Sequence, residues 1–227
     1  MIAENVAYIQ SKIAAAAQKS GRSPSDVKLI GVTKTIDIER IRALLNLGVK
    51  SLGENKPQEL VEKYNILGSE PEWHLIGHLQ TNKVKMVIDK VSMIHSLDSL
   101  RLANEINRRS ADINRKTNVL VEINIASEPS KHGIAPDETS EFVRQLVEMQ
   151  HLNVCGLMCI APYVDEPEKN RIYFVKMRQI FIDIKSKYVH NKDILDLSMG
   201  MTNDYEIAVE EGATMVRIGT GIFGLRA

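Results

Sequence analysis

The stretch Val27-Lys28-Leu29-Ile30-Gly31-Val32-Thr33-Lys34 predicts a buried strand that ends in a lysine. An apolar run this short and this rich in Val and Ile is typical of the fully buried strands of parallel sheets. A lysine that closes such a strand lies at the edge of the sheet where α/β folds place their ligands. Because a lone strand-end lysine is most often only solvated surface, the interpretation of Lys34 depends on the rest of the chain.

The rest of the chain repeats a short apolar run followed by a segment with helical spacing. An amphipathic helix over residues 3–20 comes first, with Val6, Ile9 and Ile13 on one face. The predicted strands are 27–34, 51–54, 72–77, 93–96, 118–125, 154–160, 194–198 and 215–218. The predicted helices between them are 37–47, one opened by Pro57, 81–90, 100–111, 137–149, 168–187 and 204–211.

This alternation implies a parallel sheet with helical crossovers. Eight units in about 200 residues match the size of a (β/α)8 barrel. The expected fold is therefore α/β, a single (β/α)8 TIM barrel with an extra N-terminal helix. A doubly wound open sheet is the alternative, since a count of strands does not close a barrel. No linker or low-complexity tract divides the chain, so residues 1–227 are expected to form one domain.

Composition excludes several classes of partner. Lys plus Arg and Asp plus Glu both number 29, so there is no net positive charge to attract nucleic acid or an anionic membrane. No apolar run approaches the roughly 20 residues that span a bilayer. The first ten residues contain Glu4 and lack the pattern of a signal peptide. We therefore expect the protein in the cytoplasm.

Neither the cysteines nor the histidines predict a metal site. Cys155 and Cys159 are four residues apart, about 13 Å along a strand, which is too far for a disulfide. We expect both to be buried, reduced thiols. His74 and His78 flank a strand, and no Glu follows His74 as a helical metalloprotease motif requires. His78 ends that strand and is kept as a residue of a possible pocket.

In a barrel of this kind, function lies where strands run into helices. Two such segments, 197–202 after the seventh strand and Gly219-Thr220-Gly221 after the eighth, are suited to an anion. Glycines let backbone N–H groups approach closely, and Ser198 and Thr220 add hydroxyl donors. A plain tight turn is the alternative. Residues 219–224 also match G-x-G-x-x-G, but no βαβ unit or acidic residue follows, which argues against a dinucleotide. The predicted strand ends are Lys34, Asn55, His78, Ser96, Asn124, Pro162, Ser198 and 217–220.

Arg217 shares a strand face with Met215 and Gly219 and is expected to point into the barrel mouth. A buried arginine stays charged and needs an acceptor. One possible acceptor is an inward carboxylate such as Glu122. An amine, a phosphate cradle and a fixed cation together suit a phosphorylated aromatic aldehyde, and pyridoxal 5'-phosphate fits that description. The connection 127–136, which contains Pro129, is the longest polar loop on this face.

Over essentially its whole length the chain resembles the pyridoxal phosphate homeostasis proteins, also described as proline-synthase co-transcribed proteins. The resemblance implies the barrel of fold-type III pyridoxal phosphate enzymes, related to the alanine racemase N-terminal domain. It also implies that Lys34 is the Schiff-base lysine and that Arg217 faces the pyridine nitrogen. The motifs that carry it are 32–35, 53–55, 73–83, 156–158, 197–201 and 216–220. The phosphate cradle it implies is Ser198, Gly219 and Thr220, with Met199 in the same motif and Asn55 and His78 lining the pocket.

The resemblance implies a protein that binds pyridoxal phosphate and affects its cellular supply, without an assigned reaction. We expect a monomer that lacks the second β-rich domain of the racemases and hence the opposing acid/base group. Tyr163 is the nearest candidate for that group, although an aromatic residue in a loop more often has no catalytic role. Apo pyridoxal phosphate enzymes are possible recipients of the cofactor. The alternatives are a pyridoxal phosphate-dependent amino-acid racemase or lyase, and a Schiff-base aldolase without cofactor.

Overall fold

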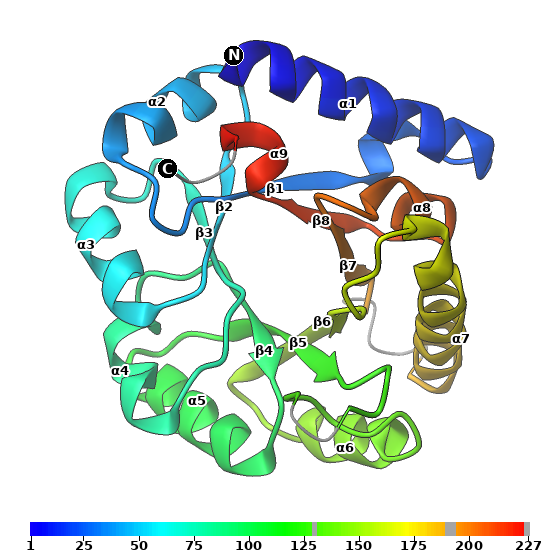
Figure 1. Cartoon of the computed structure of the whole chain (residues 1–227). Helices are drawn as coiled ribbons and strands as arrows, with labels where there is room; N and C mark the ends of the chain where they lie inside the picture. The colour runs from blue at the N-terminus through cyan, green and yellow to red at the C-terminus, as the bar shows by residue number, and fades with distance from the viewer. Residues whose placement is uncertain (129–130, 189–193, 225–227) are drawn as a thin grey trace.

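Eight parallel strands close into a barrel in the order in which they occur in the chain, and the last strand pairs with the first (Figure 1). The computed structural model describes residues 1–128, 131–188 and 194–224. The closed barrel confirms the predicted fold and excludes the open sheet. The strands are β1 (Lys28–Val32), β2 (Ser51–Glu54), β3 (Glu72–Leu75), β4 (Met93–Leu97), β5 (Thr117–Ile123), β6 (Leu152–Cys159), β7 (Asp196–Met201) and β8 (Met215–Ile218).

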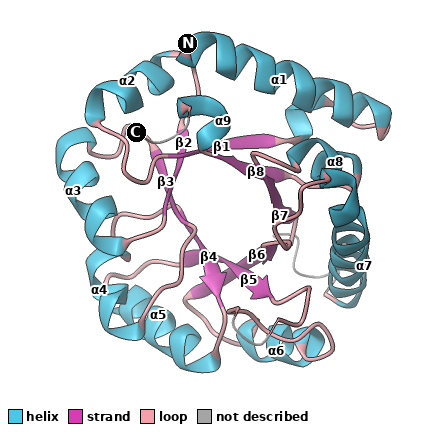
Figure 2. Cartoon of the chain, in the orientation of Figure 1, coloured by secondary structure: helices cyan, strands magenta, loops and turns pink. Residues whose placement is uncertain are grey.

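Helices form a ring outside the strands (Figure 2). The additional first helix packs against the last two helices across the seam where the barrel closes, and Asn5 Nδ2 donates to Ile222 O at 2.9 Å there. The α-helices are α1 (Ile2–Lys19), α2 (Ile38–Asn46), α3 (Pro57–Leu67), α4 (Val84–Val87), α5 (Leu100–Asp112), α6 (Thr139–Leu146), α7 (Arg171–Lys187), α8 (Tyr205–Glu210) and α9 (Thr220–Phe223).

Local sequence explains where several helices begin. The Asp37 side chain accepts from Arg40 N at 2.9 Å and caps α2. Ser99 caps α5 in the same way, and Pro57 occupies the first turn of α3. The helix predicted over 81–90 is much shorter, a 3₁₀ turn followed by the four residues of α4. Its segment is rich in β-branched residues, which lower helix propensity, and no side chain caps its start.

The core has two layers with different chemistry. The layer between strands and helices is apolar and contains most of the buried side chains. The barrel interior holds a small apolar cluster made of Ile30, Met93, Leu120, Cys155, Met158 and Met215. Polar side chains share this interior, among them His95, Ser198 and Arg217, all nearly or fully buried. Cys155 and Cys159 are buried and unlinked, as predicted.

The pairing of β1 with β8 brings the two ends of the chain together. Ile30 is the register partner of Arg217, and Gly31 is the partner of Ile218. A Cβ placed on Gly219 would lie 3.4 Å from Val32 O, so the glycine turn passes directly beside the end of β1. Lys34 and the 217–220 segment therefore lie at the same end of the barrel. None of the described helices is long and apolar enough to cross a bilayer.

Candidate functional site

Lys34 lies in a tight turn that follows β1, and it is partly buried. Ile36 N donates to Thr33 O at 3.0 Å, and Thr35 has a left-handed backbone with a φ of 63°. A non-glycine residue adopts that conformation when surrounding contacts hold it. Thr35 N donates to Glu59 Oε1 at 2.5 Å, and Thr33 Oγ1 donates to Glu54 Oε1 at 2.6 Å. The residues on both sides of Lys34 are thus fixed.

A buried ammonium group ties these contacts into one cluster. Lys63 Nζ donates to Thr33 O at 2.6 Å, and to Oε1 of both Glu54 and Glu59 at 2.7 Å. Burial raises the pKa of Glu54, and the hydrogen bonds from Lys63 and Thr33 oppose that rise. We call Glu54, Glu59 and Lys63 the lysine-turn cluster. Because its three charged groups share hydrogen bonds, it is a rigid support for the Lys34 turn.

Arg217 projects from β8 into the barrel interior, as predicted. Its Nη1 donates to Ser198 Oγ at 2.5 Å, and its Nη2 donates to Cys159 O at 2.8 Å. Burial lowers the pKa of Arg217, but a guanidinium remains charged in a protein. Within the described residues, no carboxylate lies within 4.0 Å of Arg217, so the alternative ion pair with Glu122 does not form. Neutral oxygens hold the guanidinium instead.

A chain of hydrogen bonds leads from Arg217 across the barrel. The Ser198 hydroxyl lies 3.1 Å from His95 Nδ1, and His95 Nε2 lies 2.9 Å from His74 Nδ1. Burial holds the pKa of His95 well below its ordinary value, so this imidazole is neutral. Since Arg217 only donates, the Ser198 hydroxyl is left to donate to His95 Nδ1. His95 then carries its proton on Nε2 and donates to His74.

The far end of this chain reaches the opposite end of the barrel. His74 accepts at Nδ1 and therefore carries its proton on Nε2, which lies 3.9 Å from Glu72 Oε2. That distance is longer than a direct hydrogen bond. Every donor in the chain points away from Arg217 and toward a partly exposed carboxylate. We name the series Arg217, Ser198, His95 and His74 the barrel relay. Its alignment fixes the guanidinium in a single orientation.

Ser198→Ala is expected to destabilise the protein by about 1.5–3 kcal/mol, the range for a hydrogen bond to a charged group. The substitution leaves the buried guanidinium with Cys159 O and removes the donor to His95. Urea denaturation of the variant, compared with Ser69→Ala at an exposed turn position, measures the loss. Equal stabilities of the two variants would contradict the relay.

Glu122 lies at the mouth of the interior and lines a cavity of about 200 Å³ with Asn124, Lys131 and His132. Its side chain is nearly buried. Burial raises the pKa of Glu122 to about 7, the nearby Asp98 carboxylate adds to the rise, and Arg217 opposes it. A carboxyl group with this pKa exchanges its proton near neutral pH.

This raised pKa predicts how stability depends on pH. Between pH 4.5 and about 7 the unfolded chain ionises Glu122 while the folded protein keeps it protonated, so the free energy of unfolding falls as pH rises. One pKa unit corresponds to about 1.4 kcal/mol, so the fall is a few kcal/mol. Urea denaturation of the cofactor-free protein across this range should show it. Glu122→Gln should remove that part of the pH dependence. A variant with the same pH profile as the wild type would rule out Glu122 as its source.

The glycine turn after β8 meets the loop after β7 through hydroxyl and amide groups. Thr220 Oγ1 lies 3.2 Å from Thr202 Oγ1, and Gly221 N donates to Thr202 Oγ1 at 3.2 Å. A Cβ on Gly221 would lie 2.9 Å from Ile218 Cγ2 and 3.2 Å from Thr202 Cγ2, so any larger residue would displace these side chains. Thr202 is therefore part of this anion-suited cradle. The sequence predicted Ser198 and Thr220 as the hydroxyl donors, with Thr202 only inside the adjacent segment 197–202.

Other predicted site residues lie in different environments. β7 continues to Met201, so Ser198 lies inside the barrel and contacts Arg217 rather than the rim cradle. Met199 belongs to the apolar layer between strands and helices, so only its backbone can serve the site. Asn55 follows β2, and its buried Oδ1 has no partner among the described residues. His78 follows β3 at the rim and contacts Asp98 at 3.1 Å. Pro129 lies outside the described residues.

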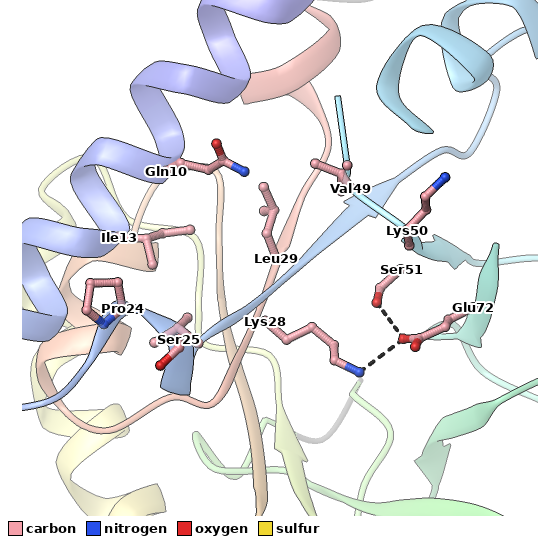
Figure 3. Close-up of a pocket in the computed structure, with 12 residues that line it drawn as sticks. Gln10, Ile13, Pro24, Ser25, Lys28, Leu29, Val49, Lys50, Ser51 and Glu72 are labelled. Atoms are coloured by element: carbon pink, nitrogen blue, oxygen red, sulfur yellow. Dashed lines mark hydrogen bonds and ion pairs between the residues drawn. The ribbon is translucent and has the colours of Figure 1, made fainter. Parts of the chain in front are cut away.

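A larger hollow, about 510 Å³, lies at the opposite end of the barrel, between α1 and the starts of β1 and β2 (Figure 3). Lys28 Nζ donates to Glu72 Oε2 at 3.0 Å there, and Ser51 Oγ donates to the same oxygen at 2.8 Å. In this fold the amino-terminal end of the barrel contributes to stability, whereas the carboxyl-terminal end carries function. The end that carries Lys34 is therefore the candidate site.

Comparison with known proteins identifies the family. The family model described as "Alanine racemase, N-terminal domain" matches residues 5–227. The pyridoxal phosphate homeostasis protein of Aquifex aeolicus is 43% identical over 224 residues, which cover 98% of this chain and 97% of the relative. The chain belongs to the pyridoxal phosphate homeostasis protein family. The member from Escherichia coli K12 is 41% identical over 234 residues, and the match covers 99% of this chain and 97% of that protein.

Solved structures agree with this family assignment. PipY of Synechococcus elongatus, solved with pyridoxal phosphate bound, is 30% identical, covers 99% of this chain and 100% of its own, and has a TM-score of 0.85. Alanine racemase of Clostridium difficile is 18% identical and shows the shared fold alone, with a TM-score of 0.73. The match covers 98% of this chain but 57% of that racemase, so the family barrel corresponds to part of the racemase chain.

Proposed function

We propose that this protein holds pyridoxal 5'-phosphate covalently on Lys34 and takes part in the intracellular homeostasis of the cofactor. The observation that carries the proposal is the pairing of β1 with β8. It brings the Lys34 turn, Arg217 and the glycine turn to one end of the barrel. Membership of the family, and the pyridoxal phosphate bound in PipY, support the same cofactor.

The residues at this end fit the cofactor. Bound pyridoxal phosphate supplies an aldehyde that condenses with an amine, and a phosphate that requires hydrogen-bond donors. The hydroxyls of Thr202 and Thr220 and the adjacent glycine turn suit the phosphate. The buried Asn55 Oδ1 lacks a partner in the described chain and is available to a ligand donor. Arg217, oriented by the barrel relay, places a cation inside the barrel for the ring nitrogen.

We further propose that the protein carries the cofactor rather than turning over a substrate. An arginine beside the ring nitrogen keeps that nitrogen unprotonated, which weakens the cofactor as an electron sink. Tyr163 is 86% exposed, so it is a poor second acid/base group. The proposed setting is the cytoplasm, with a monomer as the working form and apo enzymes as recipients of the cofactor.

The test is reconstitution of the wild-type protein with pyridoxal phosphate. We expect new visible absorption and, after borohydride reduction, a mass increase equal to one phosphopyridoxyl group on the peptide that contains Lys34. Protein that stays colourless and unmodified in the presence of excess cofactor would overturn the proposal. An adduct confined to other lysines would overturn the assignment of Lys34.

One observation favours a second candidate, an amino-acid racemase or lyase that uses the same cofactor. The Glu122 carboxyl group, with its pKa raised to about 7 by burial, is able to exchange a proton at neutral pH. Exchange of amino-acid α-protons with deuterated water, followed by NMR, separates the two functions. Saturable exchange that disappears in Glu122→Gln would favour the enzyme, and no exchange above free cofactor would favour the carrier.

A further inference from the structure

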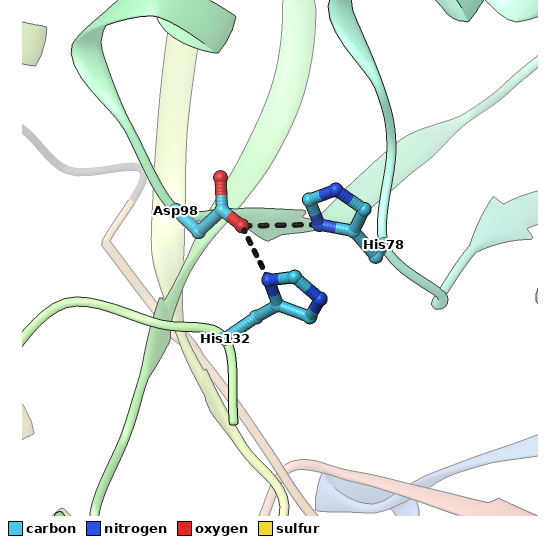
Figure 4. Close-up of side chains that lie close together, drawn as sticks. All are labelled: His78, Asp98 and His132. Atoms are coloured by element: carbon cyan, nitrogen blue, oxygen red, sulfur yellow. Dashed lines mark hydrogen bonds and ion pairs between the residues drawn. The ribbon is translucent and has the colours of Figure 1, made fainter. Parts of the chain in front are cut away.

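Two histidines and an aspartate from three consecutive loops converge at the rim of the barrel. His78 follows β3, Asp98 follows β4, and His132 lies in the loop after β5. Each offers one ligand atom, and these atoms all lie within 4.8 Å of one another. Figure 4 shows both imidazoles directed at the same carboxylate. The sequence predicted no metal site, because its cysteines and histidines lack the spacing of a metal-binding motif.

The ligand atoms have the spacing of a coordination site. His78 Nδ1 lies 3.1 Å from Asp98 Oδ2, and His132 Nδ1 lies 3.7 Å from the same oxygen. In a tetrahedral zinc site with ligands at about 2.0–2.1 Å, neighbouring ligand atoms are about 3.3 Å apart. The two observed distances lie on either side of that value. The imidazole rings stack, with centroids 3.8 Å and planes 12° apart, so their in-plane Nδ1 lone pairs run nearly parallel. Coordination of one ion therefore requires the exposed His132 ring to turn about its own side-chain bonds.

Backbone contacts hold each of the three loops. A Cβ on Gly77 would lie 2.4 Å from Asn55 O, so the residue before His78 is pressed against the β2 loop. Ser96 Oγ donates to Gly77 O at 2.7 Å, which joins the His78 loop to the strand before Asp98.

The His132 loop is attached to the end of β5. Ile134 N donates to Glu122 O at 2.8 Å, and Asn124 N donates to Ile134 O at 3.0 Å. Gly133 has a φ of 114°, and a Cβ there would lie 2.6 Å from Asn124 N. The loop therefore returns to the strand immediately after His132, which fixes where that imidazole can lie.

We propose that His78, Asp98 and His132 form a binding site for a divalent transition metal of the zinc type. Two imidazoles and a carboxylate are ligands that suit Zn²⁺ and Co²⁺ better than Ca²⁺ or Mg²⁺, which prefer oxygen. Three protein ligands leave a position open to water. The metal would tie the loops after β3, β4 and β5 together at the mouth. This inference does not depend on the proposed function.

The test uses tag-free, cofactor-free protein treated with a chelator and then titrated with Co²⁺. We expect saturable visible d–d absorption with one ion per chain, and displacement of Co²⁺ by Zn²⁺. Asp98→Asn and His132→Ala should each weaken binding at least about tenfold. His151→Ala is the matched control, because it removes a partly buried histidine beside the start of β6, at the other end of the barrel. Lys34→Ala should bind Co²⁺ as wild type does.

Circular dichroism of each variant checks that it is folded. No saturable Co²⁺ signal in the wild-type protein would overturn the proposal. Equal binding by the wild type, Asp98→Asn and His132→Ala would also overturn it, and so would an equal loss in His151→Ala. His132 is mostly exposed, with 57% of its side chain accessible, so its replacement leaves the core intact.

Discussion

Lys34→Ala is expected to abolish covalent attachment of pyridoxal phosphate while the barrel remains folded. Lys34 is partly buried in a turn outside the apolar core, so its truncation removes the amine without opening a core cavity. Reconstituted variant protein should lack the visible absorption of the wild type. After borohydride reduction, the fraction of variant chains that carry the adduct mass should be less than about one-tenth of the wild-type fraction. Only non-specific lysines remain to react.

The matched control is Lys56→Ala, which removes an exposed lysine at the start of α3, two positions beyond the end of β2. This variant should form the adduct to the wild-type extent. Normal adduct in Lys34→Ala would show that another amine holds the cofactor. Loss of the adduct in both variants would indicate that the positive charge of the rim, rather than one specific lysine, is required.

Lys63→Met is expected to cost about 3–5 kcal/mol of folding free energy, the range for breaking a buried ion pair by removing one partner. Glu54 is fully buried, and its Oε1 would lose the hydrogen bond from Lys63 Nζ. Thr33 O and Glu59 Oε1 would lose the same donor. Because these groups hold the backbone on both sides of Lys34, the variant should also bind less cofactor at equal concentration.

Urea denaturation at constant ionic strength measures this loss, with Lys85→Met as an exposed control expected to stay within about 0.5 kcal/mol of wild type. The double variant Glu54→Gln/Lys63→Met removes both charges of the buried Glu54–Lys63 pair and should recover part of the loss. If Lys63→Met lowers the free energy of unfolding by less than about 1 kcal/mol, the lysine-turn cluster contributes little to stability.

The barrel was predictable because buried parallel strands are continuous apolar runs that alternate with helices. The rim residues Lys34, Asn55 and His78 were predictable for the same reason, because each follows a strand. Strand length was not predictable at β7. The extension of β7 to Met201 placed Ser198 inside the barrel and made Thr202 the hydroxyl nearest the glycine turn.

Contacts across the barrel left little signal in the sequence. His74 and His95 pack together only because β3 and β4 are neighbours, and Ser198 reaches His95 from the far side of the interior. In the lysine-turn cluster, the spacing of Glu59 and Lys63 at i and i+4 is visible, but the third member, Glu54, comes from a strand. Asp98 and His132 likewise meet through loop geometry alone.

The seam between β1 and β8 has a consequence for biosynthesis. Residues 215–221 supply Arg217 and the glycine turn, and they leave the ribosome after some two hundred others. A nascent chain that already exposes Lys34 has neither the guanidinium nor the glycine turn opposite it. The proposed cofactor pocket is therefore absent until residues 215–221 have been made, and tight retention of the ligand would report that the first and last strands of the barrel have joined.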